Sequence, residues 1–195
     1  MKTKERIILA TLDLAAEYGL KSLSMSQIAE AVGIRKPSLY NHFDSKESLI
    51  REMYQFLREQ SKANQTPPAL DMSLSAYEIL CQYVASYKQM ISNEAMMNFY
   101  KVIYAERTTN PDAAQILIDE TNKMVAATKM LLQYLAEQGK LAISDLDSAA
   151  ISFAMTIHSL IDFELDCAQT DEQFDTSQIN NFIKWFCAQN QKEAK

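Results

Sequence analysis

Cysteine and histidine are scarce in this 195-residue chain, and their spacing excludes several kinds of site. The three cysteines, Cys81, Cys167 and Cys187, form no C-x-x-C pair and no disulfide framework. We interpret them as buried reduced thiols, with a redox sensor as the alternative. Neither His42 nor His158 has a nearby cysteine or a histidine four residues away. The sequence therefore predicts no metal site and no cofactor.

Long apolar runs and the motifs of enzymes are also missing. No window approaches the roughly 18 uncharged apolar residues of a membrane span. The N-terminus continues into an amphipathic segment rather than an apolar signal-peptide core. We expect a cytoplasmic protein without a membrane partner. No glycine-rich phosphate loop, G-x-S-x-G or paired-histidine motif is found, so we expect no enzyme.

Charge is unevenly distributed along the chain, whose formal net charge is −6. Residues 1–62 carry ten Lys and Arg against eight Asp and Glu, whereas residues 63–195 carry nine against seventeen. A basic end on an acidic chain indicates a local contact with a polyanion.

Helix starts and ends can be placed because glycine and proline are few. Gly19, Gly33 and Gly139 each close a segment with helical periodicity, and Pro37 and Pro111 lie just inside helix starts. Capping pairs are predicted at Ser24 and Gln27, Ser75 and Glu78, Ser144 and Asp147, and Asp175 and Gln178. The sequence predicts an all-α fold with nine helices, at about 3–18, 25–32, 36–42, 45–61, 75–91, 94–107, 111–138, 145–168 and 176–190.

The organisation into domains follows from a polar stretch that ends at Pro67–Pro68, which we interpret as a linker. We expect an N-terminal domain over residues 1–50, joined by the connecting helix 45–61 to a helical domain over 62–195.

Two short helices separated by Gly33 form the most informative segment. Ile28, Ala29 and Val32 are expected to face inward on the first helix, and Leu39 and Phe43 on the second. A tight glycine turn between two such helices is typical of a helix-turn-helix. The second helix offers hydrogen-bond donors, and no acidic residue lies between Glu30 and Asp44. Such a composition favours insertion of this helix into a nucleic-acid groove lined by phosphates.

These residues resemble the DNA-binding signature of TetR regulators. The matching positions are Ile28, Ala29, Gly33, Ile34, Leu39, Tyr40, His42, Phe43, Lys46, Glu47 and Leu49. The resemblance is specific over about residues 5–50. It implies a TetR-like fold, with an N-terminal three-helix DNA-binding domain and a C-terminal helical domain for ligand binding and dimerisation. The family usually has Ser or Thr where Arg35 stands, and an arginine cannot cap a helix in that way.

Carried over to this chain, the resemblance implies roles for individual residues. Lys36, Ser38 and Asn41 would face base edges or nearby phosphates, and Pro37 would contact a thymine methyl. Tyr40, His42 and Lys46 would hold the DNA backbone. Ser24 and Ser26 would clamp a phosphate, and Arg35 would reach another. The alternative for Tyr40 and His42 is a packing role.

Met and Tyr side chains at helical spacing predict an effector pocket in the C-terminal domain, with core packing as the alternative. A small apolar or aromatic effector is expected there. The candidate pocket residues are Tyr83, Tyr87, Met97, Tyr100, Tyr104, Glu106, Met124, Met155 and His158.

The last two helices resemble the family's dimerisation pair, with internal core as the alternative. The candidate interface residues are Ala149, Ser152, Thr156, Ser159, Leu160, Phe182, Ile183 and Phe186. Two such pairs, one from each subunit, would form an intersubunit four-helix bundle.

The sequence thus predicts a transcriptional regulator that binds a palindromic operator in double-stranded DNA as a homodimer. Repression is the family's usual mode, although the residues do not distinguish a repressor from an activator. The competing functions are an enzyme and a helix-turn-helix kept only for protein interaction.

Overall fold

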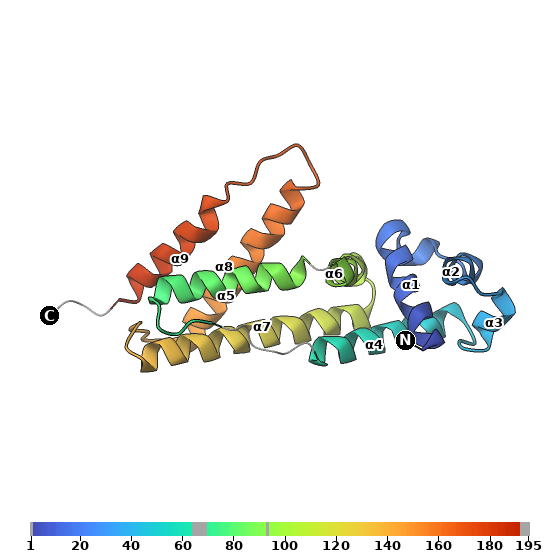
Figure 1. Ribbon diagram of the computed structural model, residues 1–195, viewed down its shortest axis with the longest axis horizontal. Helices are drawn as coiled ribbons and strands as arrows, with labels where there is room; N and C mark the ends of the chain where they lie inside the picture. The colour runs from blue at the N-terminus through green and yellow to red at the C-terminus, as the bar shows by residue number, and fades with distance from the viewer. Residues whose placement is uncertain (1, 64–69, 93, 192–195) are drawn as a thin grey trace. The chain divides into compact units, whose positions relative to one another are not determined.

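The computed structural model describes residues 2–63, 70–92 and 94–191. These ranges contain nine α-helices, one short 3-10 helix and no strand (Figure 1). The elements are α1 (Thr3–Tyr18), η1 (Leu20–Ser22), α2 (Met25–Val32), α3 (Lys36–Tyr40), α4 (Lys46–Ala63), α5 (Ala76–Ile91), α6 (Glu94–Glu106), α7 (Pro111–Glu137), α8 (Leu146–Cys167) and α9 (Ser177–Gln189). The predicted all-α fold is confirmed, and the predicted helix ends differ by two residues at most. The predicted linker at Pro67–Pro68 lies outside the described residues.

Side-chain caps explain why several helices begin where the sequence predicts. The N–H of Gln27 donates to the hydroxyl of Ser24, while Gln27 Oε1 accepts from the Ser24 N–H at 2.9 Å. The same reciprocal pair forms between Ser75 and Glu78 before α5. Each cap satisfies backbone donors that the first helical turn leaves without a partner.

Two predicted caps are wrong in detail. Before α9, the Asp175 carboxylate accepts from the N–H of Ser177 at 2.9 Å, and Thr176 occupies the N-cap without a side-chain bond. Before α8, the N-cap is Asp145 rather than the predicted Ser144, because the Asp145 carboxylate accepts from the Ser148 N–H at 3.0 Å. Asp and Ser side chains can bond to backbone groups at more than one spacing, so the pattern alone does not fix the register.

The chain divides into two compact units. The first contains the described residues of 1–66 and 91–120. The second contains those of 67–90 and 121–195. Packing therefore groups α6 and the beginning of α7 with the N-terminal helices, whereas the predicted functional boundary lies near residue 62.

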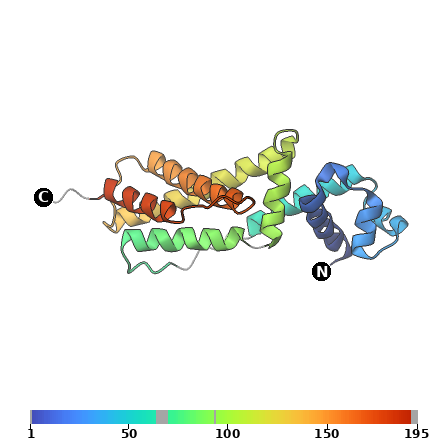
Figure 2. The same ribbon diagram turned by 90° about the horizontal axis from the view of Figure 1, so that it is seen from above.

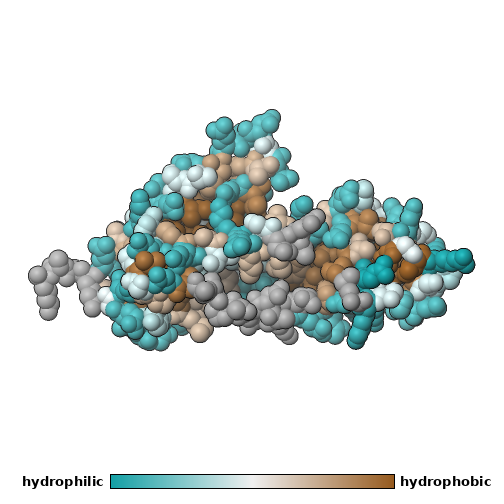
Figure 3. All heavy atoms as spheres, viewed as in Figure 1, coloured by the Kyte–Doolittle hydropathy of each residue, from teal (hydrophilic) through white to brown (hydrophobic). Residues whose placement is uncertain are grey.

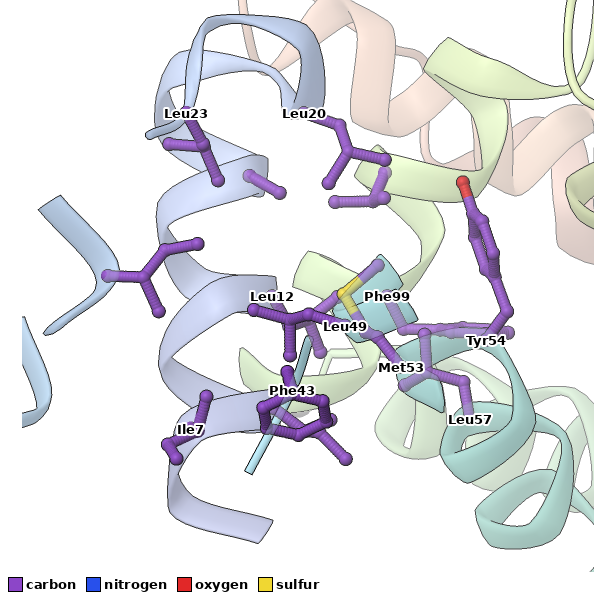
Figure 4. Close-up of a cluster of buried hydrophobic side chains, with 14 of the residues drawn as sticks. Ile7, Leu12, Leu20, Leu23, Phe43, Leu49, Met53, Tyr54, Leu57 and Phe99 are labelled. Atoms are coloured by element: carbon purple, nitrogen blue, oxygen red, sulfur yellow. The ribbon is translucent and has the colours of Figure 1, made fainter. Parts of the chain in front are cut away.

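One apolar core holds the first unit together (Figure 4). It gathers side chains from α1, α2, α3 and α4 and continues into α6 and α7. Its labelled members in the figure are Ile7, Leu12, Leu20, Leu23, Phe43, Leu49, Met53, Tyr54, Leu57 and Phe99. Burial of each large apolar side chain stabilises the fold by about 1.5–3 kcal/mol, so this core fixes the helices that carry the exposed surface of α3.

The second unit is a bundle built from α5, most of α7, α8 and α9 (Figure 2). Phe153 of α8 is buried, and its ring centroid lies 4.9 Å from that of Phe186 in α9. Ile79 and Leu80 of α5 and Leu132 of α7 are fully buried. Among the described residues, no helix is long and apolar enough to cross a membrane.

Candidate nucleic-acid interface

A glycine in the left-handed backbone conformation ends α2 and starts the turn toward α3. Gly33 has φ 75° and ψ 33°, a conformation that costs residues with a Cβ about 1–2 kcal/mol. Its N–H donates to the carbonyl of Glu30 at 3.0 Å, and the N–H of Ile34 donates to the carbonyl of Ala29 at 3.0 Å. These two bonds form a Schellman motif, which stops the helix and redirects the chain.

The short helix α3 is held by its buried side. Leu39 is fully buried and Phe43 is nearly so, and both belong to the core of the first unit. The N–H groups of His42 and Phe43 donate to the carbonyl of Leu39 at 3.0 and 3.1 Å, so the turn after α3 stays closed. Because five residues do not form a stable helix alone, α3 depends on this anchoring.

The opposite side of α3 is exposed and carries hydrogen-bond donors. The exposed residues are Arg35, Lys36, Pro37, Ser38, Tyr40, Asn41 and His42. No acidic side chain interrupts this run. A surface of this kind can contact phosphates and base edges, because a nearby carboxylate would repel phosphate.

Ser24 and Ser26 lie at the start of α2, and Lys46 is the first residue of α4. Ser24 and Ser26 are exposed, although the Ser24 hydroxyl donates to Gln27 Oε1 at 2.7 Å within its own capping box. Lys46 is half-buried, and its Nζ donates to the carbonyl of Lys21 at 3.1 Å. Lys46 thus holds the turn between α1 and α2 in addition to the phosphate contact that the sequence predicts.

Two basic residues of α1, Lys4 and Arg6, contact the helix-turn-helix although the sequence does not single them out. Arg6 Nη2 donates to the carbonyl of Val32 at 3.1 Å, which ties α1 to the last turn of α2. The ammonium of Lys4 lies 5.2 Å from the centroid of the Phe43 ring. In the sequence, these contacts could have been inferred only from the position of Lys4 and Arg6 on the first amphipathic helix, close to the inward-facing Ile7.

The predicted interface residues on α8 and α9 fall into two groups. Ser152 and Ser159 are exposed, and Ala149, Thr156, Leu160 and Phe182 are half-buried. Ile183 and Phe186 instead lie inside the second unit, with 0 % and 4 % of their surface exposed. On the same two helices, Ile151, Phe163 and Trp185 are large apolar residues that are 52 %, 51 % and 56 % exposed. In the view of Figure 3, hydrophobic residues reach the surface over parts of α8 and α9.

The predicted pocket residues do not all lie in one unit. Met97, Tyr100, Tyr104 and Glu106 lie on α6 in the first unit, where the Tyr100 and Tyr104 ring centroids are 6.2 Å apart. Met155 is 40 % exposed and shares the outer side of α8 with Ile151 and Phe163.

The other four predicted pocket residues, Tyr83, Tyr87, Met124 and His158, also lie in the second unit. The Tyr83 hydroxyl lies 3.2 Å from Thr128 Oγ1, and the Tyr87 hydroxyl lies 3.0 Å from Nδ1 of His158. Met124 is half-buried on α7. Burial raises the pKa of Tyr83, while the hydrogen bond with Thr128 opposes that rise. Partly buried hydroxyl and imidazole groups of this kind orient ligands in apolar sites.

Two family models match this chain, one over the helix-turn-helix segment and one over the C-terminal helices. The model "Bacterial regulatory proteins, tetR family" matches residues 7–53. The model "AefR-like transcriptional repressor, C-terminal domain" matches residues 78–186, which is more than half of the chain. The chain belongs to the TetR family. The family resemblance that residues 5–50 indicate is therefore confirmed, and it extends over the C-terminal helices.

Individual TetR-family proteins resemble this chain over different lengths. The transcriptional repressor KstR2 of Rhodococcus jostii is 52 % identical over 40 residues, which cover 20 % of each chain. The negative regulator of the biofilm operon, IcaR of Staphylococcus aureus, is 31 % identical over 98 residues, or 45 % of this chain and 53 % of IcaR. The chain thus matches about half or less of the length of these curated relatives.

A solved structure matches almost the whole TetR-family chain. It is the flavonoid-responsive regulator FrrA, with a TM-score of 0.66, 21 % identity and coverage of 98 % of both chains. At this identity the likeness concerns the fold, which is the nine-helix TetR architecture predicted for this chain. The family consists of transcriptional regulators and not of enzymes.

Proposed function

We propose that this TetR-family protein is a transcriptional repressor that binds an inverted-repeat operator in double-stranded DNA as a homodimer and responds to a small effector. The single observation that carries the DNA-binding proposal is the exposed side of α3, which offers donors from Lys36 to His42 while Leu39 and Phe43 anchor the helix in the core. A helix presented in this way fits the major groove of DNA, where base edges are distinguishable.

The DNA-binding proposal is tested by titrating duplex DNA at several salt concentrations. Asn41→Ala should weaken binding to the preferred duplex by about 1–3 kcal/mol, because its amide would pair with a base edge. Asn122→Ala, at an exposed position of α7 in the second unit, is the matched control and should change nothing. Affinity that does not depend on salt would favour a protein-interaction module instead.

The homodimer proposal is supported by the exposed apolar residues of α8 and α9. Phe182 and Trp185 of α9 stack with ring centroids 5.8 Å apart, and Phe163 of α8 packs against Phe174 at 5.6 Å. We assign the interface to these side chains together with Ala149, Ser152, Thr156, Ser159 and Leu160. Several large apolar side chains exposed on two neighbouring helices favour an interface there, and a two-fold dimer would match the two halves of an inverted repeat.

The effector proposal is supported by Tyr83, Tyr87, Met124 and His158 in the second unit. Their hydroxyl and imidazole groups would orient a small apolar or aromatic molecule among α5, α7 and α8. The responsiveness of FrrA to flavonoids, as its name states, is consistent with an aromatic effector. Such a molecule lowers DNA affinity only by as much as it prefers the conformation that binds DNA poorly. A hundredfold loss therefore requires a preference of about 2.7 kcal/mol.

A further inference from the structure

The start of α3 differs chemically from the starts of α2, α5 and α8, which are capped by Ser24, Ser75 and Asp145. The N-cap residue of α3 is Arg35, whose backbone is extended, with φ −75° and ψ 145°, and whose side chain makes no capping bond. An N-cap side chain normally accepts a hydrogen bond from the second or third N–H of the helix.

The backbone of α3 explains why no capping side chain is needed. The second helical residue is Pro37, which has no N–H. The N–H of the third residue, Ser38, donates to the carbonyl of Arg35 at 2.8 Å. Both donors that a cap would satisfy are therefore already removed or bonded, and the side chain at position 35 is free of that structural task.

The side chain of Arg35 is available for another partner. It is exposed, and within the described part of the chain the structure gives it no hydrogen bond or ion pair. Because residues three apart lie on the same side of a helix, Arg35 and Ser38 share one flank of α3. Lys36 and Tyr40, four apart, share another. The first residues of a recognition helix are those that reach base edges in the major groove.

We propose that Arg35 is a specificity-determining residue that recognises a guanine in each operator half-site. The guanidinium presents two parallel N–H donors that match O6 and N7 of guanine, the commonest specific contact in the major groove. This inference deepens the proposed DNA-binding function and depends on it. Pro37 and Arg35 act as a pair, since the proline removes the donor that would otherwise favour a capping residue at position 35.

The test is selection of bound duplexes from a random-sequence pool by the full-length protein and by Arg35→Ser. Wild-type protein should enrich an inverted repeat with one guanine per half-site that Arg35→Ser no longer requires. Replacing that guanine should weaken wild-type binding by about five- to 150-fold per half-site and leave Arg35→Ser unaffected. Because the backbone donors at the start of α3 are already removed or bonded, Arg35→Ser should retain helical content and thermal stability.

Two further variants separate base recognition from contact with a phosphate. Arg35→Lys keeps the charge without the planar fork, so it should keep the salt dependence and lose most of the guanine preference. Lys36→Ser, on the other flank, should weaken binding without changing that preference. If Arg35→Ser selects the same sequences as wild type while the salt slope falls, Arg35 contacts a phosphate and the inference is wrong. If wild-type protein enriches no duplex, the proposed function itself fails.

Discussion

The hydroxyl of Tyr54 in α4 accepts a hydrogen bond of 3.3 Å from the side-chain amide of Asn110, which at the same time caps α7 by accepting from the N–H of Asp112 at 2.9 Å. Arg58, one turn further along α4, lies 3.3 Å from the carboxylate of Asp112. The start of α7 is therefore joined to α4 by polar contacts at the edge of the core of the first unit.

The burial of Tyr54 predicts a loss of stability at high pH. Burial and the nearby charge of Glu106 raise the pKa of Tyr54 from 10.0 to about 12. Because the pKa of Tyr54 is higher in the folded state than in the unfolded state, the contribution of its neutral hydroxyl to stability is complete below pH 10. This contribution is lost as the pH rises toward 12. The free energy of unfolding should fall in this window by up to about 1.4 kcal/mol per pH unit from this residue.

The measurement is denaturant unfolding between pH 9 and pH 12 for wild type and for Tyr54→Phe. The variant should be less stable at neutral pH, because the hydrogen bond with Asn110 is lost, and its pH slope should be smaller. The difference between the two slopes removes the contributions of other tyrosines, such as Tyr83. Equal slopes would mean that Tyr54 ionises as an ordinary tyrosine does.

Gly33→Ala should destabilise the helix-turn-helix through the backbone alone. No heavy atom lies within 4 Å of a Cβ added at Gly33, but the positive φ of 75° remains unfavourable for alanine. The expected loss is about 1–2 kcal/mol, measured by denaturant unfolding. Glu30→Ala, at an exposed position of α2, serves as the control and should change stability by less than about 0.5 kcal/mol. A fully stable Gly33→Ala would show that the turn relaxes to another conformation.

The two roles of Lys46 can be separated by charge. Lys46→Ala should lower the slope of log affinity against log salt by about 1 per protomer if the ammonium neutralises a phosphate. Lys46→Gln is neutral and keeps an N–H donor, although its side chain is one atom shorter than the lysine that bonds to the carbonyl of Lys21. Both variants should therefore show the same reduced slope. Recovery of the wild-type slope by Lys46→Gln would assign Lys46 to the turn alone.

The proposed dimer predicts that a charge at Trp185 separates the protomers. Trp185 is 56 % exposed, so Trp185→Asp should yield a folded monomer with reduced operator affinity. Met130→Asp is the matched control, because Met130 is 73 % exposed on α7 and lies outside the proposed interface. Sedimentation velocity at micromolar concentration and circular dichroism report assembly and folding. Wild-type protein that sediments as a monomer would contradict the proposal.

The effector proposal predicts that Tyr87 contributes to ligand affinity. A thermal-shift screen of aromatic and hydrophobic compounds should identify stabilising ligands, and those ligands should weaken DNA binding. Tyr87→Phe removes the hydroxyl that contacts His158 and should weaken such a ligand by about 0.5–1.5 kcal/mol. Tyr134→Phe, at a residue of α7 that is 41 % exposed, should have no effect. A Tyr87→Phe protein with unchanged ligand affinity would exclude this hydroxyl from the site.

Local signals in the sequence predicted most of the helices, because Ser24, Ser75 and Gly33 act on neighbouring backbone groups. The exposed side of α3 was also predictable, since Leu39 and Phe43 fix which way that helix faces. The packing of α9 could not be predicted from the sequence. Periodicity places Phe182, Ile183 and Phe186 on one apolar stripe, but it does not say which part another helix of the same chain will cover. In the structure, Phe153 covers Phe186 and leaves Trp185 exposed.

The grouping of α6 and the first turns of α7 with the N-terminal helices bears on how chimeric regulators should be engineered. A fragment cut near residue 62 would expose the apolar surface that Phe99, Ile103 and Ile116 cover in the first unit. Such a fragment should aggregate or bind dyes that report exposed apolar surface. A transplanted DNA-binding module is better built to include residues 91–120, with the splice to the recipient protein placed inside α7 after Glu120.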